Sequence, residues 1–243
     1  MTFFIIGIII GSVMGLTGSG GALVAIPLFM ILLKLPLMEA TVWSLLAVIL
    51  ASVLNFIPLW RSAQYRLSLV MFTASLVGSY LTTPLKPNLS ENIIAILLAI
   101  VSIASLVGVW KGNKTTTADN QNQSLFLQLL SGLGLGALTT LTGLGGGVLL
   151  MPILLGIFHL PQASALATSL LTIFLSSGAS LALQAKQGFA LPEIMQMGSL
   201  SLGIISSVGG VMLLGRYIPE EKLKFFRKLI FTLVVLLALT KIF

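Results

Sequence analysis

The stretch "GLTGSGGALVAIP" at residues 15–27 places a cluster of glycines inside a long apolar run. A closely similar stretch, "TLTGLGGGVLLMP", stands 125 residues later, at residues 140–152. Comparing residues 7–46 with 132–171 at this offset gives 14 identities in 40 positions without a gap. Shared apolar composition does not explain threonine, glycine and proline matches in register. The sequence therefore predicts two homologous halves.

The composition is that of an integral membrane protein. Of the 243 residues, 57% are hydrophobic and 8% are charged, and the mean hydropathy is +1.10. A single soluble core of this size does not bury so much apolar surface. Several uncharged runs exceed the roughly 20 residues that cross a bilayer as a helix, so we expect an all-α polytopic protein in the plasma (inner) membrane.

The residue types exclude several kinds of chemistry. The chain has no cysteine and one histidine, which excludes thiolate chemistry and a histidine metal cluster. The spans contain no nucleophile with a base and no paired carboxylates, so an enzyme is disfavoured and no cofactor is expected. The net charge is +7, but the sequence has no basic stripe with interleaved aromatic residues of the kind that indicates nucleic-acid binding.

The two halves are joined by a polar linker. We expect a first repeat at 1–110, a linker at 111–124 that includes "KGNKTTTADNQNQ", and a second repeat at 125–243. Each half has one apolar segment interrupted by glycines (3–33 and 125–158), followed by three ordinary spans. A 31-residue helix would be about 46 Å long, too long for one straight crossing. Each interrupted segment is therefore expected to be two half-helices.

The basic residues favour interrupted segments that return to their own side of the membrane. If each segment is a re-entrant hairpin, nine basic residues lie on one side and four on the other, whereas a single crossing gives six and seven and favours neither orientation. The halves are then inverted repeats with both termini outside. The nine are Arg61, Arg66, Lys111, Lys114, Arg216, Lys222, Lys224, Arg227 and Lys228, and the four are Lys34, Lys86, Lys186 and Lys241.

The glycine clusters are candidate anion-binding elements. Non-helical backbone at membrane depth survives only against protein or a wet cavity, and the start of a half-helix directs free N–H groups at the break. Two such ends would form a mid-membrane anion site without any buried lysine or arginine. The alternative is that the glycines only allow close helix packing, as G-x-x-x-G spacing does at Gly7, Gly11 and Gly15. The candidate residues are Thr17, Gly18, Ser19, Gly20, Gly21, Thr142, Gly143, Leu144, Gly145, Gly146 and Gly147.

Polar residues in the span after each cluster form a second candidate set. Each trio covers about 80° of one helix face, and the two trios correspond at the offset of 125. The alternative is that each side chain bonds to its own helix backbone. The trios are Ser44, Ser52 and Asn55, and Ser169, Ser177 and Ser180.

Charged and aromatic residues mark the ends of the spans. Arg61 and Lys186 correspond at the offset of 125 and follow the two polar-faced spans. They could draw anions to each entrance or anchor helix ends at the interface. Trp43, Trp60 and Trp110 lie near segment ends and are interpreted as interfacial anchors.

The motifs resemble those of a known family. "GSVMGLTGSGGALVAIP" at 11–27 and "GALTTLTGLGGGVLLMP" at 136–152 are similar to the duplicated "G-x-x-x-G-x-x-G-x-G-G-G-x-x-x-x-P" pattern of the TauE/SafE sulfite exporter family. The pattern departs at Ala22 and Thr140, where glycine is often found. The resemblance implies a permease for small sulfur-containing anions such as sulfite or sulfoacetate.

These observations together predict a secondary transporter that exports a small anion. Its partners are the anionic substrate and membrane lipid, and a homodimer is left open. An anion channel is the alternative that would use the same hydrogen-bond donors. An intramembrane enzyme and a purely structural membrane subunit are the remaining alternatives.

Overall fold

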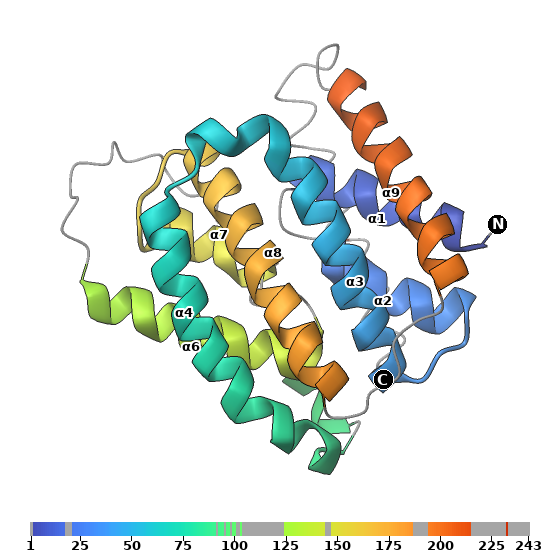
Figure 1. Ribbon diagram of the computed structural model, residues 1–243, viewed down its shortest axis with the longest axis horizontal. Helices are drawn as coiled ribbons and strands as arrows, with labels where there is room; N and C mark the ends of the chain where they lie inside the picture. The colour runs from blue at the N-terminus through green and yellow to red at the C-terminus, as the bar shows by residue number, and fades with distance from the viewer. Residues whose placement is uncertain are drawn as a thin grey trace.

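The computed structural model describes residues 2–17, 21–90, 124–143, 147–186 and 194–214, together with positions 92–94, 96–97, 99–100, 103 and 232. Within these residues every regular element is a helix (Figure 1). The elements are α1 (Thr2–Thr17), α2 (Gly21–Leu32), α3 (Leu37–Phe56), η1 (Ile57–Ser62), α4 (Tyr65–Thr82), η2 (Thr83–Asn88), α6 (Leu125–Thr142), α7 (Gly147–Gly156), α8 (Gln162–Lys186) and α9 (Ile194–Leu214).

The predicted all-α polytopic fold is confirmed. Four helical stretches in the described residues are long and apolar enough to cross a membrane: Leu37–Ser62, Tyr65–Asn88, Leu125–Thr142 and Gln162–Lys186. The predicted spans at 92–110 and 229–240 fall almost entirely outside the described residues. Each interrupted segment is described as two helices, with residues 18–20 and 144–146 outside the description.

Glycines bring two pairs of helices into backbone contact. On α6, a Cβ at Gly132 would lie 2.5 Å from the carbonyl oxygen of Met71 in α4, and a Cβ at Gly136 would overlap the backbone of Ser75. On α1, Gly7 is pressed in the same way against Leu200 of α9. Only a residue without a side chain allows helix axes to approach this closely. The G-x-x-x-G spacing at Gly7 therefore serves helix packing, as predicted from its sequence.

The corresponding pairs of the two halves are packed alike. α6 against α4 and α1 against α9 are both close pairs, and each joins the first helix of one half to a later helix of the other. α3 and α8, which correspond at the offset of 125, pack against each other between these pairs. How the two halves are related across a membrane stays a prediction.

The direction of each helix follows from these contacts. We call the end of the bundle where α3 begins and α4 ends the Lys86 end, and the opposite end the Arg61 end. α6 runs in the same direction as α4, because Gly132 lies at Met71 and Gly136 at Ser75. α6 therefore begins at the Arg61 end.

The second interrupted segment returns to the end from which it started. α8 also begins at the Arg61 end, because the Gln64 backbone N–H donates to Thr168 Oγ1 (3.0 Å) and Ser68 Oγ donates to the Thr168 carbonyl (3.2 Å). The chain from Leu125 to Pro161 thus leaves the Arg61 end through α6 and comes back through α7. This path agrees with the hairpin interpretation of that segment.

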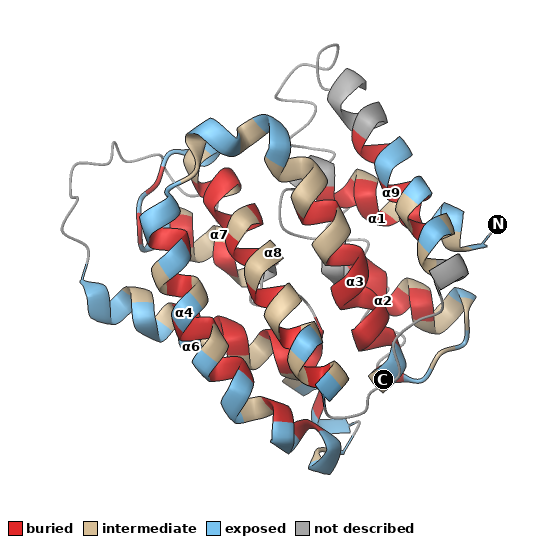
Figure 2. Ribbon diagram, in the orientation of Figure 1, coloured by how far each residue is buried: buried red, intermediate tan, exposed pale blue. Residues whose placement is uncertain are grey.

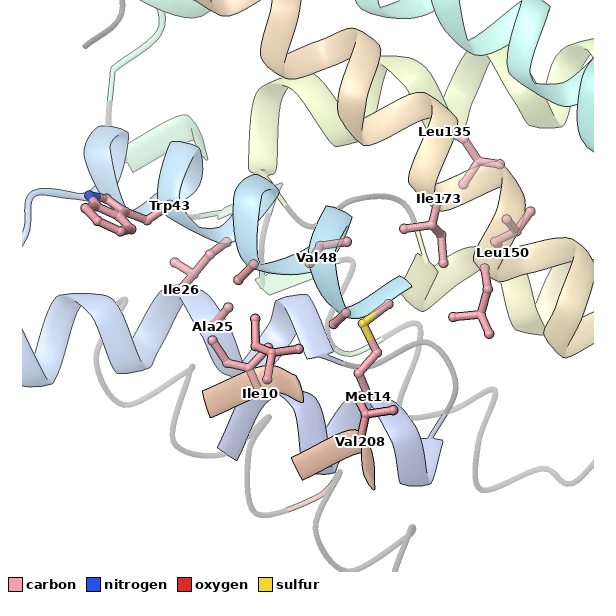
Figure 3. Close-up of a cluster of buried hydrophobic side chains, with 14 of the residues drawn as sticks. Ile10, Met14, Ala25, Ile26, Trp43, Val48, Leu135, Leu150, Ile173 and Val208 are labelled. Carbon is pink, nitrogen blue, oxygen red and sulfur yellow. The ribbon is translucent and has the colours of Figure 1, made fainter. Parts of the chain in front are cut away.

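Buried apolar side chains fill the space between the helices (Figures 2 and 3). Trp43 belongs to this core: it is 7% exposed, and its ring centroid lies 5.0 Å from that of Phe3 and 5.7 Å from that of Phe29. The interpretation of Trp43 as an interfacial anchor is therefore wrong. α1 and α2 pack over the first turns of α3 and cover the indole, which the position of Trp43 in the sequence does not reveal.

Candidate functional site

The second helix break is held against the beginning of α3. Gly143 caps α6 in the left-handed conformation (φ 70°), and its N–H donates to the Thr139 carbonyl at 2.9 Å. Ser44 Oγ of α3 donates to the Gly143 carbonyl at 2.8 Å. A Cβ on Gly143 would lie 2.5 Å from Thr41 Cβ and 2.7 Å from Thr41 Cα. Because Thr41 is in the second turn of α3, Gly143 lies toward the Lys86 end.

A fully buried lysine stands beside this break. Lys86 of η2 is 0% exposed. Its Nζ donates to Thr41 Oγ1 at 2.9 Å and to Gln184 Oε1 at 2.7 Å. Lys86 therefore links η2, the beginning of α3 and the end of α8, and Thr41 connects it to Gly143. We call Lys86, Thr41 and Gln184 the Lys86 site.

The burial of Lys86 was not expected from the sequence, which places Lys86 with Lys34 among the basic residues on one side of the membrane. The sequence "TPLKPN" around Lys86 has two prolines and is typical of a loop. In the structure η2 continues α4 and turns Lys86 inward, whereas Lys34 is exposed. No signal in the sequence separates these two lysines.

A buried ammonium calls for a physical reason. Moving such a charge out of water costs several kcal/mol, and hydrogen bonds to the charge offset part of that cost. Ionisable residues inside the spans of membrane proteins are for this reason usually functional. The position of Lys86 therefore adds a functional candidate that the sequence did not supply.

α8 carries a buried polar stripe, made of Ser177, Ser180 and Gln184, at the three- and four-residue spacing of one helix face. Ser180 Oγ lies 3.0 Å from both Ser79 Oγ of α4 and Thr140 Oγ1 of α6. This cluster joins three helices through hydroxyl groups. Ser180 is therefore used between helices rather than along its own backbone.

Three buried polar atoms have no hydrogen-bond partner within the described part of the chain. They are Thr139 Oγ1, Ser177 Oγ and Gln184 Nε2. Two of them lie on the α8 polar stripe. A buried donor without an acceptor costs about 1–3 kcal/mol, so these atoms indicate where a polar ligand or water would be stabilised.

Other predicted site residues bond along their own helix. They follow the alternative stated for polar residues in spans, and none of these bonds joins two helices. The bonds run from Ser52 Oγ to the Ile49 carbonyl (2.9 Å), from Asn55 Nδ2 to Ala51 (2.8 Å), from Ser169 Oγ to Leu166 (2.8 Å) and from Thr142 Oγ1 to Leu138 (2.6 Å). Of the two trios, Ser44 and Ser180 bond to other helices, and Ser177 Oγ has no hydrogen-bond partner in the described residues.

Much of both glycine clusters lies outside the described residues. This holds for Gly18, Ser19, Gly20, Leu144, Gly145 and Gly146. Thr17, Gly21 and Gly147 are helix ends. α2 and α7, which follow the two clusters, contact each other.

The two predicted entrance charges lie at opposite ends. Arg61 is in η1 at the Arg61 end, and Lys186 is the last residue of α8 at the Lys86 end; both are exposed. The Arg61 guanidinium carbon lies 5.3 Å from the centre of the Trp60 ring. This stacking agrees equally with an anchoring role and with an entrance charge.

The described interior contains buried polar groups and no buried carboxylate. Glu39 is the only acidic residue in the described part of the chain, and it is exposed. The buried polar groups around Gly143 and along α8 are hydroxyls, one amide and one ammonium. Such groups supply hydrogen-bond donors and positive charge, which suit a ligand rich in oxygen acceptors.

Comparisons with known proteins place the chain among membrane transporters. The family model "Sulfite exporter TauE/SafE" matches residues 3–240. The chain is 27% identical over 201 residues to a Bacillus subtilis (strain 168) protein named "Probable membrane transporter protein YunE", covering 71% of this chain and 73% of that protein. No solved structure matches the chain.

Proposed function

Because the chain belongs to the sulfite exporter TauE/SafE family, it is a multi-pass membrane transporter, and we propose that its substrate is a small sulfur-containing anion such as sulfite or sulfoacetate. The observation that carries the proposal is the set of buried polar groups around Gly143 and along α8. Glu39 is the only acidic residue in the described part of the chain, and it is exposed. Donors without competing carboxylates favour an oxyanion over a cation.

The proposed binding groups come from both halves. The glycine clusters would supply backbone N–H groups at the beginnings of α2 and α7, where the helix dipole is positive. The α8 polar stripe would add hydroxyl and amide donors, and Ser44 would hold the Gly143 carbonyl in place. Backbone and hydroxyl donors recognise charge and size more than the central atom, which leaves several oxyanions as candidate substrates.

The proposed direction is export driven by the membrane potential. An inside-negative potential drives each negative charge outward by about 2.3 kcal/mol per 100 mV. The interior described here contains no buried carboxylate of the kind that relays protons in coupled transporters. Electrogenic, facilitated export needs no such relay.

The test is sulfite flux in proteoliposomes that hold the purified protein, with an imposed potential and with sulfate, sulfoacetate, phosphate or chloride as competitor. We expect saturable sulfite flux that follows the potential and is reduced by sulfoacetate. Flux that does not saturate would indicate an anion channel instead. Absence of flux for all these anions, or flux that needs a proton gradient and ignores the potential, would overturn the proposal.

A further inference from the structure

Two arginines lie on the turn that joins α3 to α4, at the Arg61 end of the bundle. Arg61 is in η1 and Arg66 is in the first turn of α4, and both side chains are exposed. Tyr65 Oη donates to the Trp60 carbonyl at 2.7 Å, which ties the first residue of α4 to η1. The Arg61 guanidinium stacks on the Trp60 ring. The turn therefore presents two cations beside two aromatic side chains.

No carboxylate compensates these two charges in the described part of the chain. Glu39, the only acidic residue there, lies in the first turn of α3 at the Lys86 end. The first turn of α4 contains no acidic residue, and its N-cap residue Gln64 makes no side-chain cap hydrogen bond. The positive end of the helix dipole adds to the charge of Arg66. An anionic group from outside the chain would therefore be stabilised at this turn.

The surface next to the arginines is first aromatic and then apolar. Trp60 and Tyr65 are each about half exposed, and such side chains prefer the interface between membrane and water. From there Leu69, Val77 and Leu81 form an exposed apolar ridge along α4 (Figure 2). The helix rises about 18 Å from Leu69 to Leu81, close to the roughly 15 Å of one hydrocarbon leaflet. The ridge is thus long enough to accompany an acyl chain across its leaflet.

We propose that this turn binds an anionic phospholipid, with its phosphate at Arg61 and Arg66 and an acyl chain along the ridge of α4. The cations, the aromatic side chains and the apolar ridge follow one another in the same order as the phosphate, the glycerol region and the acyl chains of such a lipid. A guanidinium can bind two phosphate oxygens at once.

The predicted topology agrees with this ligand. The basic residues predict that the Arg61 end is cytoplasmic, and anionic lipids of the cytoplasmic leaflet attract basic residues near the surface. The inference assigns Arg61 to a lipid rather than to the entrance of the substrate. It does not depend on the proposed transport of an anion.

The test uses Trp60 as a reporter in the full-length protein. The chain has three tryptophans, so Trp43→Phe together with Trp110→Phe leaves Trp60 alone. The protein is placed in phosphatidylcholine vesicles that contain brominated phosphatidylglycerol or brominated phosphatidylcholine at equal mole fraction, and the quenching of Trp60 fluorescence is compared. We expect brominated phosphatidylglycerol to bind about fivefold or more tightly, since one basic residue near an anionic surface contributes about 1 kcal/mol.

Variants of the two arginines place the lipid. Arg61→Gln combined with Arg66→Gln should remove the preference, so that the two brominated lipids quench Trp60 about equally. Replacing both arginines by lysine retains the charge without the bidentate geometry and should keep part of the preference. The matched control is Lys34→Gln, which removes an exposed basic residue at the Lys86 end and should leave the preference unchanged.

Three outcomes would overturn the inference. The first is equal quenching by the two lipids when both arginines are present, and the second is a preference for phosphatidylglycerol that persists when both are glutamine. The third is no quenching by either lipid, which would show that protein covers Trp60, as in an interface between two copies of the chain.

A second measurement decides if Trp43→Phe prevents folding, since Trp43 packs against Phe3 and Phe29. Native mass spectrometry then compares the phosphatidylglycerol retained by the protein with all three tryptophans and by its Arg61→Gln, Arg66→Gln variant. Retention that is lost in the variant supports the inference, and equal retention overturns it.

Discussion

Replacing Gly143 by alanine should destabilise the protein through two separate effects, one in the backbone of Gly143 and one in its contact with α3. The left-handed conformation of Gly143, at φ 70°, costs an L-residue about 1–2 kcal/mol. The new Cβ would also lie 2.5 Å from Thr41 Cβ and 2.7 Å from Thr41 Cα, and overpacking of this kind costs about 1–3 kcal/mol.

The two costs add because they have different origins. One arises in the backbone of Gly143 and the other in the contact with α3, whose backbone cannot rotate away as a side chain would. Gly143 lies outside the helical turns of α6, so alanine gains no helix propensity there. We expect the free energy of unfolding to fall by about 2–5 kcal/mol.

The assay is unfolding of the purified protein in mixed micelles with increasing SDS, followed by circular dichroism and tryptophan fluorescence. The matched control is Gly134→Ala on the same helix, where an added Cβ has no heavy atom within 4 Å. That variant should be stabilised by about 0.5–1 kcal/mol, since alanine is the better helix former. If Gly143→Ala is as stable as Gly134→Ala, the described contact between the second break and α3 is wrong.

Two further predictions concern the α8 polar stripe and the path of the chain. Ser180→Ala should lower the free energy of unfolding by about 1 kcal/mol in the same SDS assay, because the hydroxyls of Ser79 and Thr140 each lose a partner. Ser177 Oγ has no described partner, so Ser177→Ala should leave the free energy of unfolding unchanged or raise it. A larger loss of stability in Ser177→Ala than in Ser180→Ala would contradict the described hydrogen bonds. The chain has no cysteine, so single cysteines at Gln64, Ser124 and Lys186 can be probed with a membrane-impermeant maleimide in intact cells. Labelling of Lys186→Cys alone is expected from the hairpin and the positive-inside rule, and labelling of Ser124→Cys together with it would refute the hairpin.

The main features of the fold could be predicted from the sequence because they depend on composition and on glycine spacing. A chain that is 57% hydrophobic has few alternatives to a bundle of apolar helices. Glycines four residues apart, such as Gly132 and Gly136, predict a close helix contact, and the structure places both against α4. The partner helix of each glycine pair could not be predicted, since G-x-x-x-G spacing carries no information on what packs against it.

The polar residues were harder to interpret because helix position alone does not say where a hydroxyl bonds. Ser44 and Ser169 correspond at the offset of 125, yet Ser44 donates across to Gly143 and Ser169 donates to Leu166 of its own helix. The difference lies in what packs against each hydroxyl, which is a tertiary property. Lys86 is the clearest case, because its burial depends on η2 continuing α4 in spite of two prolines.

The Lys86 site also breaks the similarity between the halves. At the offset of 125, Lys86, Thr41 and Gln184 correspond to Val211, Leu166 and Leu59, so none of the three polar groups recurs. A charge present at one end of the bundle binds an anion more strongly there than at the opposite end. With the Lys86 end outside, as the basic residues predict, this buried cation lies at the end of the bundle where export finishes. Sulfite added on the outside should therefore compete with export at lower concentration in the unaltered protein than in Lys86→Met. Equal competition from the outside in both proteins would show that the asymmetry in sequence has no counterpart in transport.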